Sequence, residues 1–188
     1  MEFSILVAQK EHTGHAMALS QAYALSAKER GIGIAVRKAS YLIDKIEKGQ
    51  AIIAFHCNEL AGFCYIETWS HSSFVANSGL IVLSKYRGQK LSLKIKQATF
   101  KLSRQLYPSA KIFGITTNPH VMKMNSSLGY IPVSYQELTE ETTFWKGCHS
   151  CPNYKILERN KFKMCMCTAM LFEEQNIQLF SKIKDHGI

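Results

Sequence analysis

The sequence predicts a single α/β domain in which helices cover a β-sheet. The chain has 188 residues, which is long enough for one domain with a substantial core. Hydrophobic residues make up 46% of it and charged residues 20%, as in an ordinary globular protein. Strand-like and helical patterns follow one another in the order β-α-α-β-β-β-α-β-α-β, and a cysteine-bearing segment comes after them. No repeat, linker or low-complexity tract divides the sequence.

The first half of the chain predicts one strand, two helices and two paired strands. Residues 3–8 (FSILVA) predict the first strand, and residues 12–31 predict a helix because apolar side chains recur there at helical spacing. Residues 40–49 predict a shorter helix that ends at its glycine. Residues 50–57 and 60–69 predict two antiparallel strands, joined by a tight Asn-Glu turn.

The second half predicts a long helix between two strands, and then a shorter helix. Ser78 and Gly79 lie inside the first of these strands and indicate a bulge or a close approach of the backbone. Asn118 is the expected N-cap of the shorter helix. The expected strands are 73–83, 111–117, 130–138 and 167–172, and the expected helices are 90–107, 118–130 and 175–185.

The charge pattern bears on the partners. The formal net charge is +9, but the lysines are spread along the chain rather than gathered in a block. Spread charge argues against a nucleic-acid surface and is compatible with a polyanionic small ligand. No apolar run is long enough to cross a bilayer, and the N-terminus lacks the features of a signal peptide. We therefore expect a cytoplasmic protein that does not bind membranes.

The stretch Leu83–Ala98 (LSKYRGQKLSLKIKQA) carries the first functional signal. A strand runs into a short basic loop that contains Gly88, and a helix follows. Backbone N–H groups at a helix start are unpaired, and the helix dipole there favours negative charge. Arg87 and Lys90 add positive charge, and Gly88 lets the backbone come close to a ligand. On these residues alone, the loop is either a phosphate site or a charged turn.

The element order around this loop resembles that of the Gcn5-related N-acetyltransferase (GNAT) family. The family's pyrophosphate loop has the form Q/R-x-x-G-x-G/A, and the residues that fill it here are Arg87, Gly88, Gln89, Lys90, Leu91 and Ser92. Lys90 replaces the central glycine and Ser92 the last small residue. The resemblance covers residues 1–136. It implies a GNAT fold, with a central mixed, mostly antiparallel sheet, helices on both faces, and a V-shaped splay between the fourth and fifth strands.

A second GNAT motif lies downstream. Family members commonly have an asparagine at the end of the next strand and then a helix ending LYEKLGF, and this chain has TTNPHVMKMNSSLGY. The resemblance places Asn118 and Lys123 among the cofactor-binding residues. The tyrosine that often protonates the departing CoA thiolate is replaced by Asn125, whose amide donates hydrogen bonds but is not an acid. Ser126 is a neighbouring candidate for this role, and water is another.

The resemblance also implies a reaction with acetyl-CoA. Backbone N–H groups of the strand segment Leu80, Ile81 and Val82 would bind the pantetheine and polarise the thioester carbonyl, as an oxyanion hole does. A primary amine then attacks directly, and a general base removes one proton from its ammonium form. Glu67 is the first candidate for this base and His71 the second. An exposed strand-end carboxylate and an ordinary loop histidine are the alternative interpretations of these two residues.

Four cysteines cluster near the C-terminus. They form Cys148-x-x-Cys151 and Cys165-x-Cys167, with 13 residues between the pairs. Zinc takes four thiolates in tetrahedral geometry, and C-x-x-C is a common half of such a site. The pattern predicts either a structural or regulatory zinc site, or buried or redox-active thiols without a metal.

The cysteine segment carries a looser resemblance. It is similar to an extension of acetyltransferase-like proteins of bacterial arginine biosynthesis, akin to N-acetylglutamate synthases. This resemblance implies a small amino acid such as glutamate as the acceptor, and a homodimer is compatible with it. Arg37 and Lys38 could hold the acceptor carboxylate or could be a solvated pair. Residues 137–188 are expected to complete the same domain as residues 1–136.

Three other functions stay open at this point. One is a GNAT fold that senses acyl-CoA without turnover, which the altered loop and Asn125 favour. Another is a protein or polyamine acetyltransferase, for which Glu137, Glu140 and Glu141 would supply the acidic cluster. The third is a zinc-dependent nucleic-acid binder, whose binding would depend steeply on salt.

Overall fold

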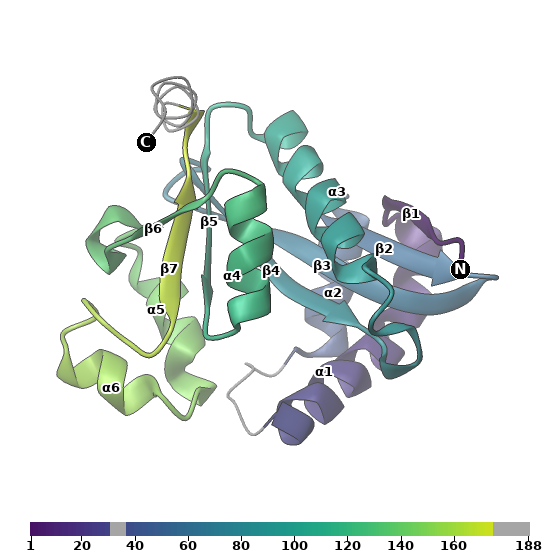
Figure 1. Ribbon diagram of the computed structural model, residues 1–188, viewed down its shortest axis with the longest axis horizontal. Coiled ribbons are helices and arrows are strands. Elements are labelled where there is room, and N and C mark those ends of the chain that lie inside the picture. The colour runs from purple at the N-terminus through teal and green to yellow at the C-terminus, as the bar shows by residue number, and fades with distance from the viewer. Residues whose placement is uncertain (31–36, 175–188) are drawn as a thin grey trace, which may run out of the picture.

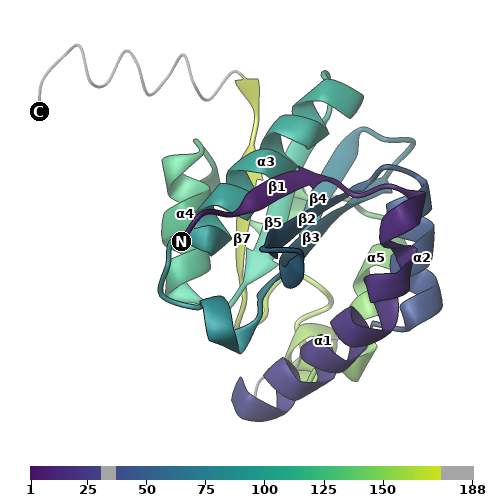
Figure 2. The ribbon, with the colours of Figure 1, turned by 90° about the vertical axis from the view of Figure 1, so that its right-hand side faces the viewer.

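The computed structural model describes residues 1–30 and 37–174 (Figure 1). One seven-stranded sheet runs through the molecule, and helices cover both of its faces (Figures 1 and 2). Within these residues, no helix combines the length and apolar character needed to cross a membrane. The strands are β1 (Ser4–Val7), β2 (Ala51–His56), β3 (Glu59–Trp69), β4 (Phe74–Val82), β5 (Lys111–Thr116), β6 (Ile131–Val133) and β7 (Thr168–Phe172). The helices are α1 (Ala16–Arg30), α2 (Ala39–Glu47), α3 (Leu91–Leu106), α4 (Pro119–Ser127), α5 (Thr142–Lys146) and α6 (Tyr154–Arg159).

The sheet is mixed and mostly antiparallel, with the strand order β1-β2-β3-β4-β5-β7-β6. Neighbouring strands run antiparallel, except that β4 and β5 run parallel. Their pairing is short, because it joins only Phe74–Ala76 to Lys111–Phe113. Beyond these residues the two strands separate. The predicted fold class, with its splay between the fourth and fifth strands, is therefore confirmed.

One face of the sheet is covered by α3, with α4 beside it (Figure 1). Apolar side chains recur along one side of α3 and are buried against β1–β4, among them Leu91, Ile95 and Leu102. Gly62 of β3 lets the helix approach closely, since a Cβ there would lie 2.5 Å from Cδ1 of Ile95. This packing fixes where α3, and the basic loop before it, stand relative to β4.

The opposite face is covered in two parts (Figure 2). Helices α1 and α2 pack over the β2–β4 half through Leu19, Leu42 and Ile46. The long connection between β6 and β7, residues 134–167, packs Trp145 and other apolar side chains over the half that contains β5 and β7. The cysteine-bearing segment is therefore this β6–β7 connection, and β7 returns from it to lie between β5 and β6.

The strand expected over residues 130–138 is shorter than predicted. It ends at Val133, because Ser134 and Glu137 form a capping box in which each side chain bonds the other residue's backbone N–H. A 3-10 turn follows and leads the chain away from the sheet. Alternation of apolar residues continued through this segment, so the hydrophobic pattern alone could not place the end of the strand.

The helix expected over residues 12–31 begins later than predicted. Lys10–His15 form a 3-10 helix, and α1 starts at Ala16. The helix expected at 175–185 lies outside the described residues. The other expected helices and strands are confirmed, with small differences at their ends.

Candidate active site

A β-bulge in β4 marks the centre of the splay. Phe63 of β3 faces Ile81, but Tyr65 faces Ser78, so two steps along β3 correspond to three along β4. Gly79 has a φ of +64°, and a Cβ on it would overlap the Tyr65 ring. Both the backbone conformation and the lack of space therefore require glycine. The bulge predicted from the sequence is confirmed.

The second half of β4 presents an open backbone edge to the splay. Leu80, Ile81 and Val82 follow the bulge and remain next to β3 on one side. On the other side, β5 pairs with β4 no further than Ala76. An open strand edge can bind an extended ligand through its backbone groups, as an added strand would. The edge therefore fits the pantetheine arm that the resemblance places there.

The basic loop before α3 turns through two residues with positive φ. Gly88 has a φ of +80° and Lys90, the residue before α3, has a φ of +59°. Both are in the left-handed region, which costs a residue with a side chain roughly 1–2 kcal/mol. Lys90 thus adopts the conformation that a glycine at this position of the GNAT pattern would favour. Lysine in place of glycine at this position therefore changes the conformational energy of the loop but not its backbone conformation.

The side chains of this loop serve different purposes. Arg87 is exposed and its guanidinium lies 3.2 Å from the Glu29 carboxylate of α1. Leu91 is buried in the core, so only its backbone can serve a phosphate. Gln89 and Ser92 are half-buried. The Arg87 guanidinium is engaged by Glu29 and the Val82 carbonyl, so the first N–H groups of α3 are what this loop offers a pyrophosphate.

Two further predicted cofactor residues belong to α4. Asn118 caps this helix, with its side-chain oxygen accepting from the His120 N–H at 2.9 Å. Lys123 is exposed on the helix. Helix α4 stands on the β5 side of the splay and α3 on the β4 side (Figure 1). A ligand held by both sets of residues would span the opening.

A cluster of polar side chains lies on the sheet face opposite α3. Tyr41 of α2 donates a hydrogen bond to the Glu67 carboxylate, and Arg37 donates through Nε to the Tyr65 hydroxyl. Tyr23 of α1 donates to the carbonyl of the bulge glycine. The Arg37 guanidinium lies 6.0 Å and 5.8 Å from the ring centres of Tyr23 and Tyr65. The cluster ties both helices to the bulge and holds a carboxylate and a guanidinium on one face.

Burial and charge set the protonation of this cluster. Burial, followed by the charge of Glu67, raises the pKa of Tyr41 above its usual value. Burial alone would lower the pKa of Arg37, but the neighbouring tyrosines and Glu67 outweigh it and raise that pKa. At neutral pH the Tyr41 hydroxyl therefore stays protonated and donates a hydrogen bond to the Glu67 carboxylate, and Arg37 stays positively charged.

The predicted catalytic residues occupy different places. Glu67 is half-buried in the cluster and faces Ala76, the last β4 residue that pairs with β5. His71 is exposed in the turn between β3 and β4. Asn125 is 1% exposed, and its Oδ1 has no hydrogen-bond partner within the described residues. Ser126 is exposed on α4. The structure thus places Glu67 beside the last β4 residue that pairs with β5 and buries Asn125 against Met170 of β7, and it leaves His71 and Ser126 at the surface.

Solved structures share this fold. N-acetylglutamate synthase from Neisseria gonorrhoeae, complexed with coenzyme A and N-acetyl-glutamate, matches 91% of this chain with a TM-score of 0.63 at 19% identity. Rv2747 from Mycobacterium tuberculosis, in complex with CoA and NLQ, matches 90% of this chain and 98% of its own length, with a TM-score of 0.63 at 15% identity. A GNAT-family acetyltransferase from Listeria monocytogenes matches 71% of this chain and 88% of its own, with a TM-score of 0.57 at 18% identity. The chain has the GNAT fold.

The GNAT likeness is one of structure. This chain spans 35% of the gonococcal synthase, about a third of that protein. No protein-family model matches the sequence, and no curated protein matches it. The comparisons therefore identify the fold and not the chemistry of the site.

Sequence reasoning missed several residues that the GNAT fold brings together. Tyr65 could have been found, because it alternates with Glu67 on one side of the strand. Tyr23 and Tyr41 come from two different helices, and no local signal announces that they meet at the bulge. Lys96 of α3 is buried in the core although its neighbours Lys94 and Lys101 are exposed. The amphipathic pattern around Lys96 predicted a helix that packs on the sheet, but it did not predict that this lysine is buried.

The four C-terminal cysteines line one small cavity of about 20 Å³ beside the GNAT sheet. Burial, and then the neighbouring thiols, raise the pKa of Cys148 to about 11 and that of Cys167 to about 12. Within residues 1–30 and 37–174, however, no group of three or more His, Cys, Asp or Glu side chains is arranged to hold a metal ion. The predicted zinc site at Cys148, Cys151, Cys165 and Cys167 is thus unsupported, and the thiols are free rather than disulfide-bonded.

A larger cavity of about 510 Å³ lies next to the cysteines, within the β6–β7 connection. Its aromatic wall includes Tyr135 and Trp145, whose rings stack at 5.3 Å. Three lysines, Lys146, Lys161 and Lys163, also line it. None of the predicted cofactor-binding residues does, so this cavity is separate from the splay.

Proposed function

We propose that the protein is an acetyl-CoA-dependent N-acetyltransferase that acts on a small amino acid such as glutamate. The observation that carries this proposal is the Arg37 and Glu67 pair beside the bulge. An α-amino acid presents an ammonium and a carboxylate close together, and a carboxylate and a guanidinium on one face match these charges. The gonococcal synthase with the same fold binds N-acetyl-glutamate, which supports glutamate as the example.

In this proposal Glu67 is the general base. Its carboxylate removes a proton from the acceptor ammonium, which makes the amine a nucleophile. Tyr41 holds the carboxylate in place by donating a hydrogen bond to it. Arg37 attracts the acceptor carboxylate and is itself fixed through Tyr65. Two tyrosines thus position the two charged groups.

The donor lies on the other side of the bulge in the same proposal. The backbone of Leu80–Val82 receives the pantetheine, and the loop Arg87–Ser92 receives the pyrophosphate. Asn118 and Lys123 contribute from the α4 side. The amine attacks the thioester carbonyl directly, so no covalent enzyme intermediate forms.

Turnover of acetyl-CoA against a panel of amino acids and polyamines tests the proposal. Mass spectrometry of the product is the readout, because the six cysteines would interfere with a thiol reagent. We expect acetylation of an acidic amino acid by the wild-type protein and loss of this activity in E67Q. Acetylation of polyamines in preference to amino acids would contradict the proposed acceptor.

An acyl-CoA sensor without turnover is the second candidate. Asn125 favours it, because an amide stands where the resemblance places an acid. Binding of acetyl-CoA without acetylation of any amine would identify the sensor.

The polyamine alternative has less support from the contacts. Two of the three residues of the acidic cluster it requires make structural contacts, since Glu137 caps a 3-10 turn and Glu141 accepts from the Ser70 N–H. Neither carboxylate is directed at the bulge by these contacts.

We also propose that residues 1–136 and 137–188 form one domain in a cytoplasmic homodimer. The insertion of β7 between β5 and β6 supports the single domain, because the sheet of the first part is completed by a strand of the second. Size-exclusion chromatography with light scattering tests the dimer, and a monomeric mass would contradict it.

A further inference from the structure

A lysine side chain is buried beneath the splay. Lys96 of α3 is 2% exposed and forms no salt bridge with any described residue. A buried ammonium without a carboxylate is unfavourable, and an apolar side chain of the same length would fill the space without that cost. Packing alone therefore gives no reason for a lysine at this position, and a buried charged group beside a ligand-binding opening is a candidate functional group.

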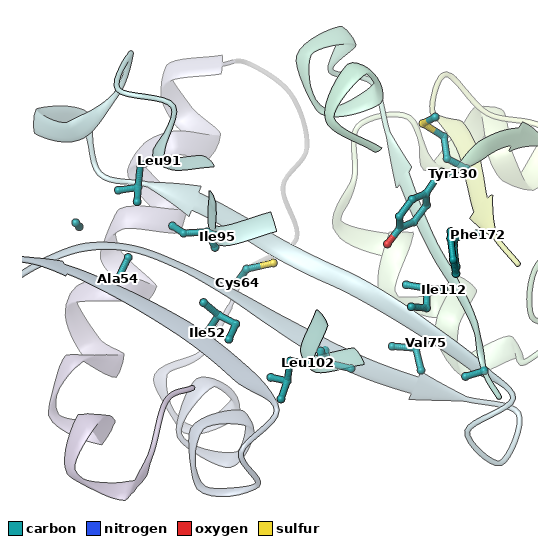
Figure 3. Packing of buried hydrophobic residues seen from close by; sticks show 14 of the residues in the cluster. Ile52, Ala54, Cys64, Val75, Leu91, Ile95, Leu102, Ile112, Tyr130 and Phe172 are labelled. Atoms are coloured by element: carbon teal, nitrogen blue, oxygen red, sulfur yellow. The ribbon is translucent and has the colours of Figure 1, made fainter. Parts of the chain in front are cut away.

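Lys96 lies beside the β4 bulge, on the α3 and α4 side of the sheet. Its ammonium is 5.2 Å from the centre of the Tyr130 ring, and the Tyr130 hydroxyl donates to Asn77 of β4 at 3.1 Å. Cys64, which interacts electrostatically with Lys96, donates to the Ser78 carbonyl at 3.3 Å. Figure 3 shows the Cys64 thiol and the Tyr130 hydroxyl directed toward each other. Lys96 is therefore linked, through Tyr130 and Cys64, to Asn77 and Ser78, the two residues that precede the bulge glycine.

The proposed reaction needs an acid for the departing thiolate, and the other candidate side chains are poorly suited to supply one. Asn125 is an amide, and Ser126 is exposed on the surface of α4. The Tyr130 hydroxyl already donates a hydrogen bond to Asn77. Burial raises the pKa of Tyr130 well above the usual value, which makes this hydroxyl a weak acid. Lys96 remains.

We propose that Lys96 is the catalytic acid that protonates the departing CoA thiolate, an inference that rests on the proposed acetyl transfer. The acceptor nitrogen bonds to the thioester carbon, the carbon–sulfur bond breaks, and its electron pair stays on sulfur. One proton passes from the Lys96 ammonium to that sulfur, giving CoA and a neutral amine. Lys96 then regains a proton from water. The proton that Glu67 took from the acceptor ammonium returns to water, and so does the second proton, which the acceptor nitrogen loses as the adduct collapses to the amide, so that one proton is released per turnover.

The surroundings of Lys96 suit this role. Burial lowers the pKa of Lys96 to about 8, and a general acid works best when its pKa is close to the working pH. The titratable groups that face it are Cys64 from β3 and Tyr130 from the chain before β6, and burial raises the pKa of both. Both are neutral at pH 7, so neither competes for the ammonium. Base and acid then stand on opposite faces of the sheet, each beside its own substrate.

The test compares K96M with wild type and with K101M, in which an exposed lysine of the same helix is replaced. For acetyl transfer we expect K96M to lose roughly 10²-fold in kcat with little change in the KM for acetyl-CoA. The wild-type kcat should fall above about pH 8, where Lys96 loses its proton, and K96M should lack this fall. K101M should behave as wild type. A K96M enzyme with wild-type kcat and pH profile would overturn the proposal.

A binding measurement separates this inference from the proposed function. Calorimetry compares CoA with desulfo-CoA, which lacks the sulfur. We expect wild type to prefer CoA, with a preference that rises from about pH 7 to a maximum near pH 8 and falls again where Lys96 has lost its proton, because the ammonium stabilises a thiolate, and we expect K96M to show no such preference. This result would support Lys96 even if no amine were acetylated. Equal affinity of the wild-type protein for both ligands at every pH would overturn the role of Lys96.

Discussion

Replacement of Lys96 by methionine should stabilise the protein at neutral pH. Burial lowers the pKa of Lys96 from 10.5 to about 8. At 1.36 kcal/mol per pKa unit, holding the ammonium charged in the folded state costs roughly 3 kcal/mol at pH 7. Loss of its contact with the Tyr130 ring returns about 1 kcal/mol. The expected net gain in the free energy of unfolding of K96M is therefore roughly 2 kcal/mol.

The gain should shrink as the pH rises. Below pH 8 Lys96 is protonated in both states, and the penalty is present in full. Between pH 8 and 10.5 the unfolded chain keeps a proton that the folded protein has released, so wild-type stability rises with pH in this window. K96M lacks the group and cannot gain in this way. The difference in the free energy of unfolding between wild type and K96M removes the contribution of the other titrating residues, which is the same in both proteins.

Urea unfolding at about pH 7 and about pH 10, under reducing conditions, measures both effects. K101M is the matched control, and its stability should stay within about 0.5 kcal/mol of wild type because Lys101 is exposed. A K96M protein less stable than wild type at pH 7, or a difference that does not change with pH, would refute the account of Lys96 as an uncompensated buried charge.

Three other substitutions test separate parts of the site. G79A should destabilise the protein by roughly 2–4 kcal/mol, because the added Cβ meets the Tyr65 ring at a left-handed φ; thermal unfolding measures this, and an unchanged Tm would contradict the bulge geometry. R37Q should raise the KM for the amino-acid acceptor about 10- to 100-fold and leave the KM for acetyl-CoA unchanged, since Arg37 is proposed to hold the acceptor carboxylate and not the donor; steady-state kinetics would refute the role of Arg37 if both constants moved together. K90G should stabilise the protein by up to about 1 kcal/mol, because glycine relieves the left-handed strain at some entropic cost, and it should retain acetyl-CoA binding; a loss of stability in urea unfolding would show that the loop depends on the lysine side chain.

Much of the fold could be predicted because its signals are local. The bulge at Ser78–Gly79 was visible as a small residue and a glycine inside an apolar strand, and the structure shows why glycine is required there. The end of the strand at Val133 was not visible, because the capping box that ends it competes with an apolar alternation that continues. Local hydrogen bonds set the end of this strand, and the alternation of apolar residues does not predict where they form.

The candidate site was predicted only where residues adjacent in sequence act together. The basic loop and the open edge of β4 are of this kind, and so is Glu67 at the end of its strand. The partners that fix Glu67 and Arg37 are tyrosines from distant segments, and their meeting depends on how α1 and α2 pack over the bulge. No sequence pattern marked Lys96 either. Its burial depends on where α3 packs relative to the splay between β4 and β5, and the sequence of the helix does not contain that information.

The most direct test of the central claim is mass-spectrometric detection of product after incubation of the protein with acetyl-CoA and a panel of amines. The account predicts an N-acetylated acidic amino acid in wild type, no product in E67Q, and a roughly 10²-fold slower reaction in K96M. An unmodified panel in the presence of bound acetyl-CoA would contradict the account and leave a protein that binds the thioester without transferring its acetyl group.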